Sequence, residues 1–154
     1  MILAGIILIL TIGVLHPILY RNIYSIGVPI PNCSQLSYNT HHLTNNGVDI
    51  YAPKGSVVEA AMSGIALHFE QRADSLWDVY TLHIPSLIVS HYANLDTVYV
   101  HYEQDIAQYT SIGLLGNKNQ DDNPYLHYEA YHLDNKNHMK RYINSLRRFN
   151  KCFE

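Results

Sequence analysis

The chain has 154 residues, of which 15% are charged, and its formal net charge is −3 at pH 7. This length suits one folded domain with a single core. The absence of a basic excess excludes the electrostatic footprint of a nucleic-acid-binding protein. Thirteen tyrosines and ten histidines stand out. Because Tyr is common in half-buried strands and His is a frequent metal ligand, the composition favours a β-rich protein with a polar site.

The N-terminal segment is apolar and carries no charge from residue 2 to residue 15, and its apolar character continues to Tyr20 before Arg21. This is about the 20 residues that a membrane-spanning helix needs. The sequence therefore predicts a membrane anchor over residues 1–24, with the rest of the chain on the extracytoplasmic side. A cleaved signal peptide is the alternative, but no Lys or Arg precedes the apolar run and no small-residue cleavage motif follows it.

Residues 25–39 contain Gly27, Pro29 and Pro31 and are predicted to be a linker. Two cysteines, Cys33 and Cys152, lie close to the two ends of the expected soluble part. Two alternatives stay open for them, a disulfide formed in an oxidising compartment or two unrelated thiols.

Residues 40–133 alternate short apolar runs with turn residues, and the runs have the lengths of strands. Residues 79–84 and 97–102 show the clearest alternation and are rich in β-branched and aromatic side chains. Breaks between the runs are predicted at Pro53-Lys54-Gly55, Ser63-Gly64, Ala93-Asn94 and Gly116-Asn117. We therefore expect a mostly β domain built on an antiparallel sheet, with strands at 48–51, 57–61, 65–69, 79–84, 87–91, 97–102, 111–115 and 126–131.

The C-terminal segment, residues 134–154, has a different pattern. Apolar side chains recur at helical spacing at Met139, Tyr142, Ile143, Leu146 and Phe149, while Lys and Arg fill the positions between them. This pattern predicts a basic amphipathic helix outside the β domain. Its basic face either is solvated or contacts anionic lipid or a partner.

Six segments together resemble, in order and spacing, the lysostaphin/LytM-type zinc peptidoglycan endopeptidases, which have the duplicated hybrid motif fold. The first, N-N-G-V-D-I-Y-A-P-K-G-S-V-V, follows that family's H-x-G-x-D metal motif except at its first residue. The six segments are residues 45–58, 60–66, 87–91, 97–101, 112–117 and 124–129. The combined pattern is far more specific than any one piece.

The resemblance implies a zinc site and an activated water, and the chain matches it only in part. Asp49 and His127 fall on two metal-ligand positions, and His101 falls on the position of a catalytic histidine. The third ligand position holds Asn45, whose amide oxygen is a poor zinc donor compared with imidazole. Tyr125 replaces the other catalytic histidine, and a phenol with a pKa of about 10 is a poor general base at neutral pH.

The resemblance with these departures predicts a degenerate member of the family, without a tightly bound cofactor and without enzymatic activity. Its expected role is to bind peptidoglycan or a cell-envelope protein through the retained groove, as a regulator or scaffold. One alternative is an active zinc endopeptidase in which His41 or His42 replaces the missing ligand. Another is a component of a secretion or mobile-element apparatus that makes its contact through the C-terminal helix.

Overall fold

The computed structural model describes residues 26–31, 35–37, 47–84, 86–117 and 123–132. All strand pairings among these residues are antiparallel, which confirms the prediction of a mostly β domain. The described strands are β1 (Gln35–Ser37), β2 (Val48–Tyr51), β3 (Val57–Glu59), β4 (Gly64–Gln71), β5 (Trp77–His83), β6 (Ile88–Val98), β7 (Asp105–Ile106), β8 (Ser111–Leu115) and β9 (Tyr125–His132).

The helices predicted over residues 1–24 and 134–154 lie outside the described residues, as do Cys33 and Cys152. Within the described ranges, no helix has the length and apolar character needed to cross a bilayer.

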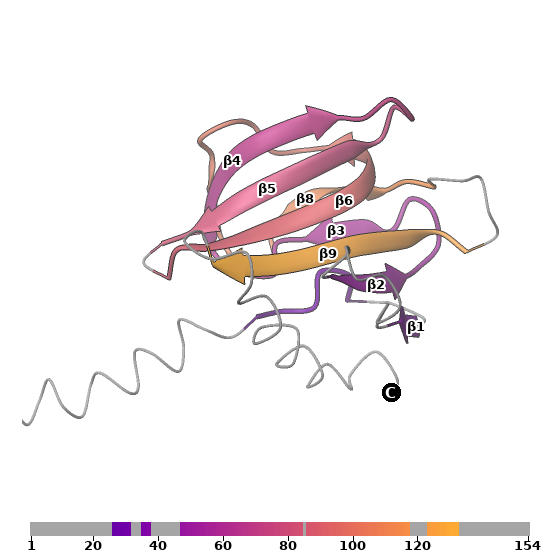
Figure 1. The fold of residues 1–154 in the computed structure, drawn as a ribbon, viewed down its shortest axis with the longest axis horizontal. Coiled ribbons are helices and arrows are strands. Elements are labelled where there is room, and N and C mark those ends of the chain that lie inside the picture. Colours follow the sequence, from indigo (N-terminus) through magenta and orange to yellow (C-terminus); the bar gives the residue numbers. More distant parts are fainter. Residues whose placement is uncertain (1–25, 32–34, 38–46, 85, 118–122, 133–154) are drawn as a thin grey trace, which may run out of the picture.

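The strands form one extended sheet in the order β1-β2-β9-β6-β5-β4-β7. Figure 1 shows β2, β9, β6, β5 and β4 as a broad twisted layer, with β3 and β8 lying behind it. Strand β6 joins the two layers, because it pairs with β9 from Ile88 to Ala93 and with β8 from Leu95 to Val98. The core lies between the layers.

Alternation along the central strands separates a core face from a polar face. In β9, Leu126, Tyr128 and Ala130 are fully buried, while the residues between them are partly exposed. Part of the segment predicted as a linker also belongs to the core, since Ile30 is only 1% exposed. Its backbone is held by the N–H of Gly27, which donates to the carbonyl of Ala61.

One strand replaces two predicted ones in the region of residues 87–102. The predicted break at Ala93-Asn94 is absorbed inside β6 as an irregularity of register, with Asn94 at a φ of 73°. Asn tolerates this left-handed conformation better than most residues, so the strand continues through it. Of the strand predicted at 97–102, only Thr97 and Val98 belong to β6. The N–H of Tyr99 still donates to the carbonyl of Ile112 in β8, but the residues after it lie outside the strand.

A buried histidine on the core face, His83, is 1% exposed and fully hydrogen-bonded. Its Nδ1–H donates to the carbonyl of Ser63 at 2.8 Å, so Nε2 accepts, and the hydroxyl of Ser90 lies 2.7 Å from it. Burial lowers the pKa of His83, although the bond to the Ser63 carbonyl acts in the opposite direction. The ring is therefore neutral in the folded protein at neutral pH.

His83 is expected to make folding sensitive to mild acid. The unfolded chain has the ordinary histidine pKa of about 6.5 and binds a proton at higher pH than the folded chain does. Stability from this residue is complete above that pH and falls as the pH decreases toward the lowered pKa of the folded state. The unfolding free energy, measured by urea titration from pH 7.5 to 5, should therefore fall more steeply in the natural protein than in His83→Gln. Parallel pH curves for the two proteins would contradict this prediction.

Candidate functional site

The polar face of the sheet gathers side chains from four neighbouring strands. Asp49 of β2 is directly opposite His127 of β9, and Glu129 of β9 is directly opposite His91 of β6. His91 in turn faces Tyr80 of β5. Residues opposite one another on adjacent strands project on the same side of a sheet, so these side chains form one continuous cluster.

Two carboxylates hold His127 in the centre of this cluster. Its Nδ1–H donates to Oδ1 of Asp49 at 2.7 Å, and its Nε2–H donates to Oε1 of Glu129 at 3.0 Å. Burial disfavours the imidazolium, but the hydrogen bonds to Asp49 and Glu129 outweigh it and raise the pKa of His127 to about 9. For Glu129, burial is likewise outweighed by its two histidine partners, which lower its pKa to about 2. The geometry favours a positive imidazolium between two negative carboxylates.

The chain of charges continues from Glu129 across β6 to β5. Nδ1 of His91 is 3.7 Å from Oε2 of Glu129, and its Nε2 is 3.1 Å from Oδ2 of Asp78. These carboxylates raise the pKa of His91 against the effect of burial. The ring of Tyr80 stacks on the ring of His91 with centroids 4.3 Å apart and planes 2° apart. This contact fixes the orientation of the imidazole.

Arg72 ends the charge chain beside the bend of β6. Its guanidinium donates to Oδ1 of Asn94 at 2.9 Å, lies 3.5 Å from Asp78 and pairs with Asp74. The amide nitrogen of Asn94 donates to the backbone carbonyl of Tyr125 at 3.1 Å. Asn94 therefore couples the bend of β6 to the strand that carries His127. We define the Asp49 cluster as Asp49, His127, Glu129, His91, Asp78, Arg72 and Asn94.

Gly47 gives His127 the room that its position requires. A Cβ at residue 47 would lie 2.6 Å from Cε1 of His127 and 2.8 Å from the carbonyl of Tyr128. Contacts this short do not occur in folded proteins without a shift of the neighbours. This site therefore requires a glycine at the third position of the N-N-G-V-D segment. Gly47, two residues after Asn45, lies against the His127 ring.

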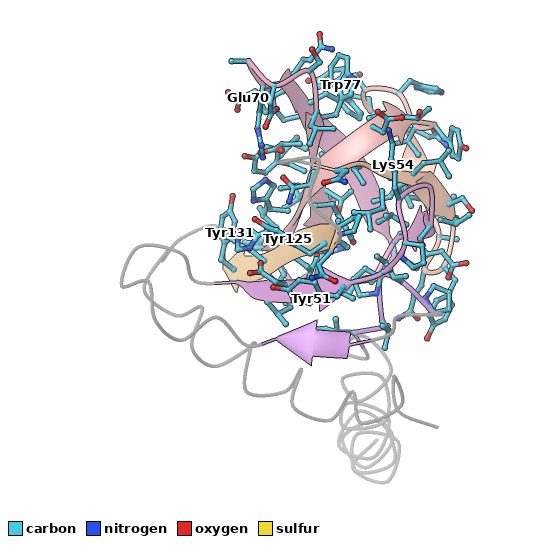
Figure 2. The ribbon with its side chains drawn as sticks, turned by 90° about the vertical axis from the view of Figure 1, so that its right-hand side faces the viewer. Tyr51, Lys54, Glu70, Trp77, Tyr125 and Tyr131 are labelled. Carbon is cyan, nitrogen blue, oxygen red and sulfur yellow. The ribbon has the colours of Figure 1, made fainter. Side chains whose placement is uncertain are left out.

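Tyr125 is placed at the edge of the cluster, beside Tyr51. The two ring centroids are 5.6 Å apart, and Figure 2 shows both side chains close together on β9 and β2. Burial and the nearby charge of Asp49 raise the pKa of the Tyr125 phenol. The hydroxyl therefore remains protonated at neutral pH, where it can donate a hydrogen bond but cannot act as a base.

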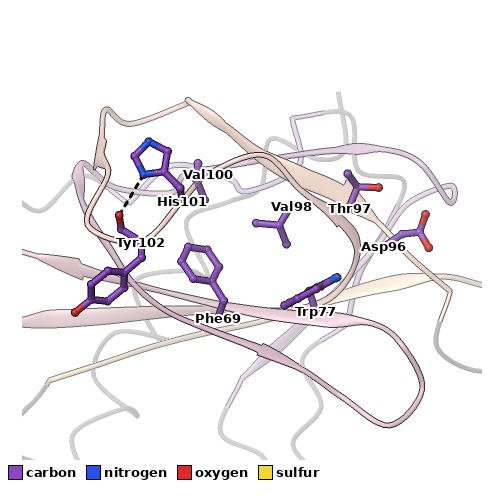
Figure 3. A pocket seen from close by; sticks show the side chains of 8 residues that line it. All are labelled: Phe69, Trp77, Asp96, Thr97, Val98, Val100, His101 and Tyr102. Atoms are coloured by element: carbon purple, nitrogen blue, oxygen red, sulfur yellow. Dashed lines mark hydrogen bonds between the residues drawn. The ribbon is translucent and has the colours of Figure 1, made fainter.

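The structure does not bring His101 to the cluster. His101 follows the end of β6, is exposed, and its Nδ1–H donates to the carbonyl of Tyr102 at 3.1 Å. Ala93 is the β6 residue opposite His127, and His101 lies eight positions further along the chain. Among the described residues, His101 lines a pocket with Phe69, Trp77 and Tyr102 instead (Figure 3). Asn45, His41 and His42 lie outside the described residues.

Several members of the Asp49 cluster were not predicted from the sequence. Glu129 was detectable, because the two-residue period of a strand places it on the same face as His127. His91, Asp78 and Arg72 gave no such signal, since their position depends on which strands pair and in which register.

Asp49 and His127 are the only sequence-predicted ligands that the described residues bring together. A catalytic zinc site uses three protein ligands and one open position. Among the described residues, no group of three or more His, Cys, Asp and Glu side chains is arranged to hold a metal ion. Both ring nitrogens of His127 are also engaged by carboxylates. The described residues alone therefore do not complete a zinc site.

Comparison with known proteins gives a family match and structural neighbours. The sequence profile of peptidase family M23 matches residues 43–141, which is more than half of the chain. No curated protein sequence is similar enough to count as a match.

Three solved structures illustrate the similarity of fold. The antimicrobial peptidase lysostaphin from Staphylococcus simulans has a TM-score of 0.62 and 18% identity, covering 75% of this chain and 50% of its own. A zinc containing peptidase from Vibrio cholerae has a TM-score of 0.51 and 22% identity, covering 70% and 32%. A chain of the SpoIIQ-SpoIIIAH pore forming complex has a TM-score of 0.57 and 19% identity, covering 70% and 84%. This chain thus spans about a third of the Vibrio peptidase and half of lysostaphin, and at these identities the likeness is one of fold.

Proposed function

The chain belongs to peptidase family M23, and from this premise we propose that it is a catalytically degenerate member that works as a binding module of the cell envelope. The observation that carries the proposal is the state of His127. Its Nδ1–H donates to Asp49 and its Nε2–H donates to Glu129, so within the described residues it is part of an ion-pair network. The substitution by Asn45 and Tyr125 at two of the family's functional positions points in the same direction.

The ligand we propose is a peptide, held on the polar face beside Tyr51 and Tyr125. Both rings are partly exposed and lie next to the Asp49 cluster, so they offer apolar contact beside charged hydrogen-bonding groups. A peptide of this kind has two sources, the stem or cross-bridge of peptidoglycan and a segment of a partner protein. One structural neighbour is a chain of a pore forming complex, and this supports a segment of a partner protein as the second source.

A sedimentation assay with insoluble peptidoglycan tests the proposal. We expect the full-length protein to be retained by the pellet without release of soluble fragments, with or without added zinc. Tyr51→Ala combined with Tyr125→Ala should weaken retention about tenfold, as expected for the loss of roughly 1–1.5 kcal/mol of aromatic contact. Tyr99→Ala is the matched control, because Tyr99 is exposed and its backbone bonds to Ile112 of β8 rather than to the strands of the polar face.

Cross-linking in the envelope separates the two sources of the peptide. No retention on peptidoglycan, together with a cross-link to an envelope protein that the double tyrosine variant loses, would assign the ligand to a partner. Zinc-dependent release of soluble fragments would overturn the proposal and favour an active endopeptidase that recruits His41 or His42. The absence of both retention and cross-linking would also overturn the proposal.

We also propose that residues 2–20 anchor the protein in a membrane and place the domain on the extracytoplasmic side. The support is the uncharged apolar run, which has about the length of a spanning helix. Recovery of the full-length protein in the soluble cytoplasmic fraction would contradict the anchor.

A further inference from the structure

Two large apolar side chains are exposed to solvent where β5 turns into β6. Ile84 is 61% exposed and Leu87 is 45% exposed. They flank the turn between His83 of β5 and Ile88 of β6, which pair with each other and are both buried. A single exposed apolar residue is common on protein surfaces, but two beside one turn form a patch that favours contact with something outside the domain.

The backbone at Leu87 has a conformation that leucine disfavours. Its φ is 53°, in the left-handed region, where Gly or Asn fits better. The hydroxyl of Ser86, which is buried, donates to the carbonyl of His83 at 3.0 Å and holds the turn. A leucine that is both strained and exposed contributes little to the fold. Its side chain therefore points to a role in contact with a partner surface.

A third exposed side chain, that of Tyr109, belongs to the same end of the domain. Its ring is 58% exposed and lies against Gly27, where an added Cβ would be 2.6 Å from the ring. Hydrogen bonds connect this region with the hairpin. The backbone N–H of Gln108 donates to the hydroxyl of Ser63 at 2.9 Å, and the carbonyl of Ser63 accepts from the ring of His83, at the end of β5, at 2.8 Å. We define the apolar pole as Ile84, Leu87 and Tyr109.

The chain enters and leaves the described domain at this pole. Near the N-terminal end, the backbone of Gly27 lies against the Tyr109 ring. At the C-terminal end, His132 of β9 is directly opposite Ile88, the first residue of β6. Figure 1 shows the start of the indigo segment of residues 26–31, the end of β9 and the end of β5 on the left-hand side of the domain. The segments before residue 26 and after residue 132 are therefore both attached at the apolar pole.

Both attached segments have compositions that suit a membrane. Residues 2–20 contain no Asp, Glu, Lys or Arg and are the proposed anchor, on which this inference rests. From residue 20 to residue 26 an extended chain spans at most about 20 Å, so the pole lies close to the point where the anchor leaves the bilayer. Residues 134–154 contain six Lys or Arg against two Asp or Glu, whereas the rest of the chain contains four against eleven. The positive charge is thus concentrated beside the pole, where it would meet anionic headgroups.

We propose that the apolar pole rests on an anionic bilayer, with Ile84, Leu87 and Tyr109 at the boundary between headgroups and acyl chains. Tyrosine is favoured at that boundary because its ring is apolar and its hydroxyl stays hydrated. The two aliphatic side chains contribute apolar area that the fold leaves in water. The domain is then held in one orientation, with the opposite end of β5 and the pocket lined by Trp77 pointing away from the membrane.

Quenching of tryptophan emission by brominated lipid tests this orientation. The full-length protein is reconstituted in vesicles of acyl-brominated phosphatidylcholine with phosphatidylglycerol as the minor lipid. Trp77→Phe removes the chain's single tryptophan, and Ile84→Trp introduces an indole at the pole. Its emission should be quenched at least about threefold more strongly than that of the matched Tyr99→Trp, because a group held about 5–10 Å into the boundary reaches the bromines. Tyr99 is also exposed but follows the far end of β6.

Leu87→Asn separates a membrane contact from a structural role. Asn accepts the left-handed backbone better than Leu does, so the melting temperature should be unchanged or higher. Removal of the apolar side chain should nevertheless reduce the bromolipid quenching of the Ile84→Trp indole at least about twofold. Unchanged quenching in this variant would overturn the inference.

Three further results would also overturn it. Equal quenching in the Ile84→Trp and Tyr99→Trp proteins, when both float with the vesicles, would reject the orientation and leave the anchor in place. Failure of the natural protein to float would reject the anchor as well. An indole at position 84 that is shielded from aqueous iodide, but not quenched by bromolipid, would assign the pole to a second copy or another protein. The proposed peptide site is tested separately, because retention on peptidoglycan depends on Tyr51 and Tyr125.

Discussion

His127→Ala is expected to lower the free energy of unfolding by about 3–5 kcal/mol, the range for breaking a buried ion pair by removing one partner. The imidazolium lies between Asp49 and Glu129, and its side chain is 16% exposed. Without it, two carboxylates on adjacent strands remain close together and largely out of water. The loss is therefore greater than that of one hydrogen bond. Urea unfolding at pH 7 in the presence of a chelator measures it with no contribution from a metal.

His101→Ala is the matched control for this experiment. Both histidines match the family's motifs, but His101 is exposed and its ring bonds only to the neighbouring Tyr102 carbonyl within the described residues. Its replacement should change the unfolding free energy by no more than about 0.5 kcal/mol. Equal effects of the two substitutions would show that the Asp49–His127–Glu129 contacts do not stabilise the fold.

Local patterns in the sequence were sufficient to predict most strands, whereas the expectation that Asp49 and His127 lie together came from the resemblance to the family. Strand lengths and turn residues define β2, β8 and β9 closely, because each is a short apolar run bounded by turn residues. The motif around residue 47 also has a physical basis, since only a glycine leaves space for the His127 ring. For these strands, the information that predicts them lies within a few neighbouring residues of the sequence.

Strand register limited what the sequence could predict. The alternation of residues 97–102 resembles a strand, yet pairing with β8 ends at Val98. The prediction that His101 is catalytic came from the resemblance of residues 97–101 to a family motif, and the structure places His101 in the lining of a pocket with Phe69 and Trp77. Conversely, Asn94 was read as part of a break, although it lies inside β6 and bonds to the strand of His127. Such positions depend on contacts between residues far apart in the chain.

Asn45→His is expected to increase zinc affinity about 100-fold over the natural protein, with little gain in peptidoglycan hydrolysis. The change returns an imidazole two residues before Gly47, which lies against the His127 ring. Dividing the roughly 10–16 kcal/mol of a four-ligand zinc site equally gives about 3 kcal/mol per ligand, or about 100-fold. Zinc titration against a competing chelator measures the affinity. Hydrolysis should remain low because the Tyr125 phenol, whose pKa is raised, cannot accept the proton of a bound water.

Cleavage should appear only when Asn45→His is combined with Tyr125→His. A histidine at 125 without a third ligand has no activated water to act on, so Tyr125→His alone should restore neither property. Because ligand and proton acceptor act on the same water, the two substitutions should be strongly non-additive in rate. Adding His101→Ala to the double variant should leave the rate unchanged, since that ring lies beside the other pocket. Zinc-dependent cleavage by the natural protein, abolished by Asp49→Ala, would contradict this account. It would mean that Asp49 and His127 form a working zinc site with a third ligand from the segment before Gly47.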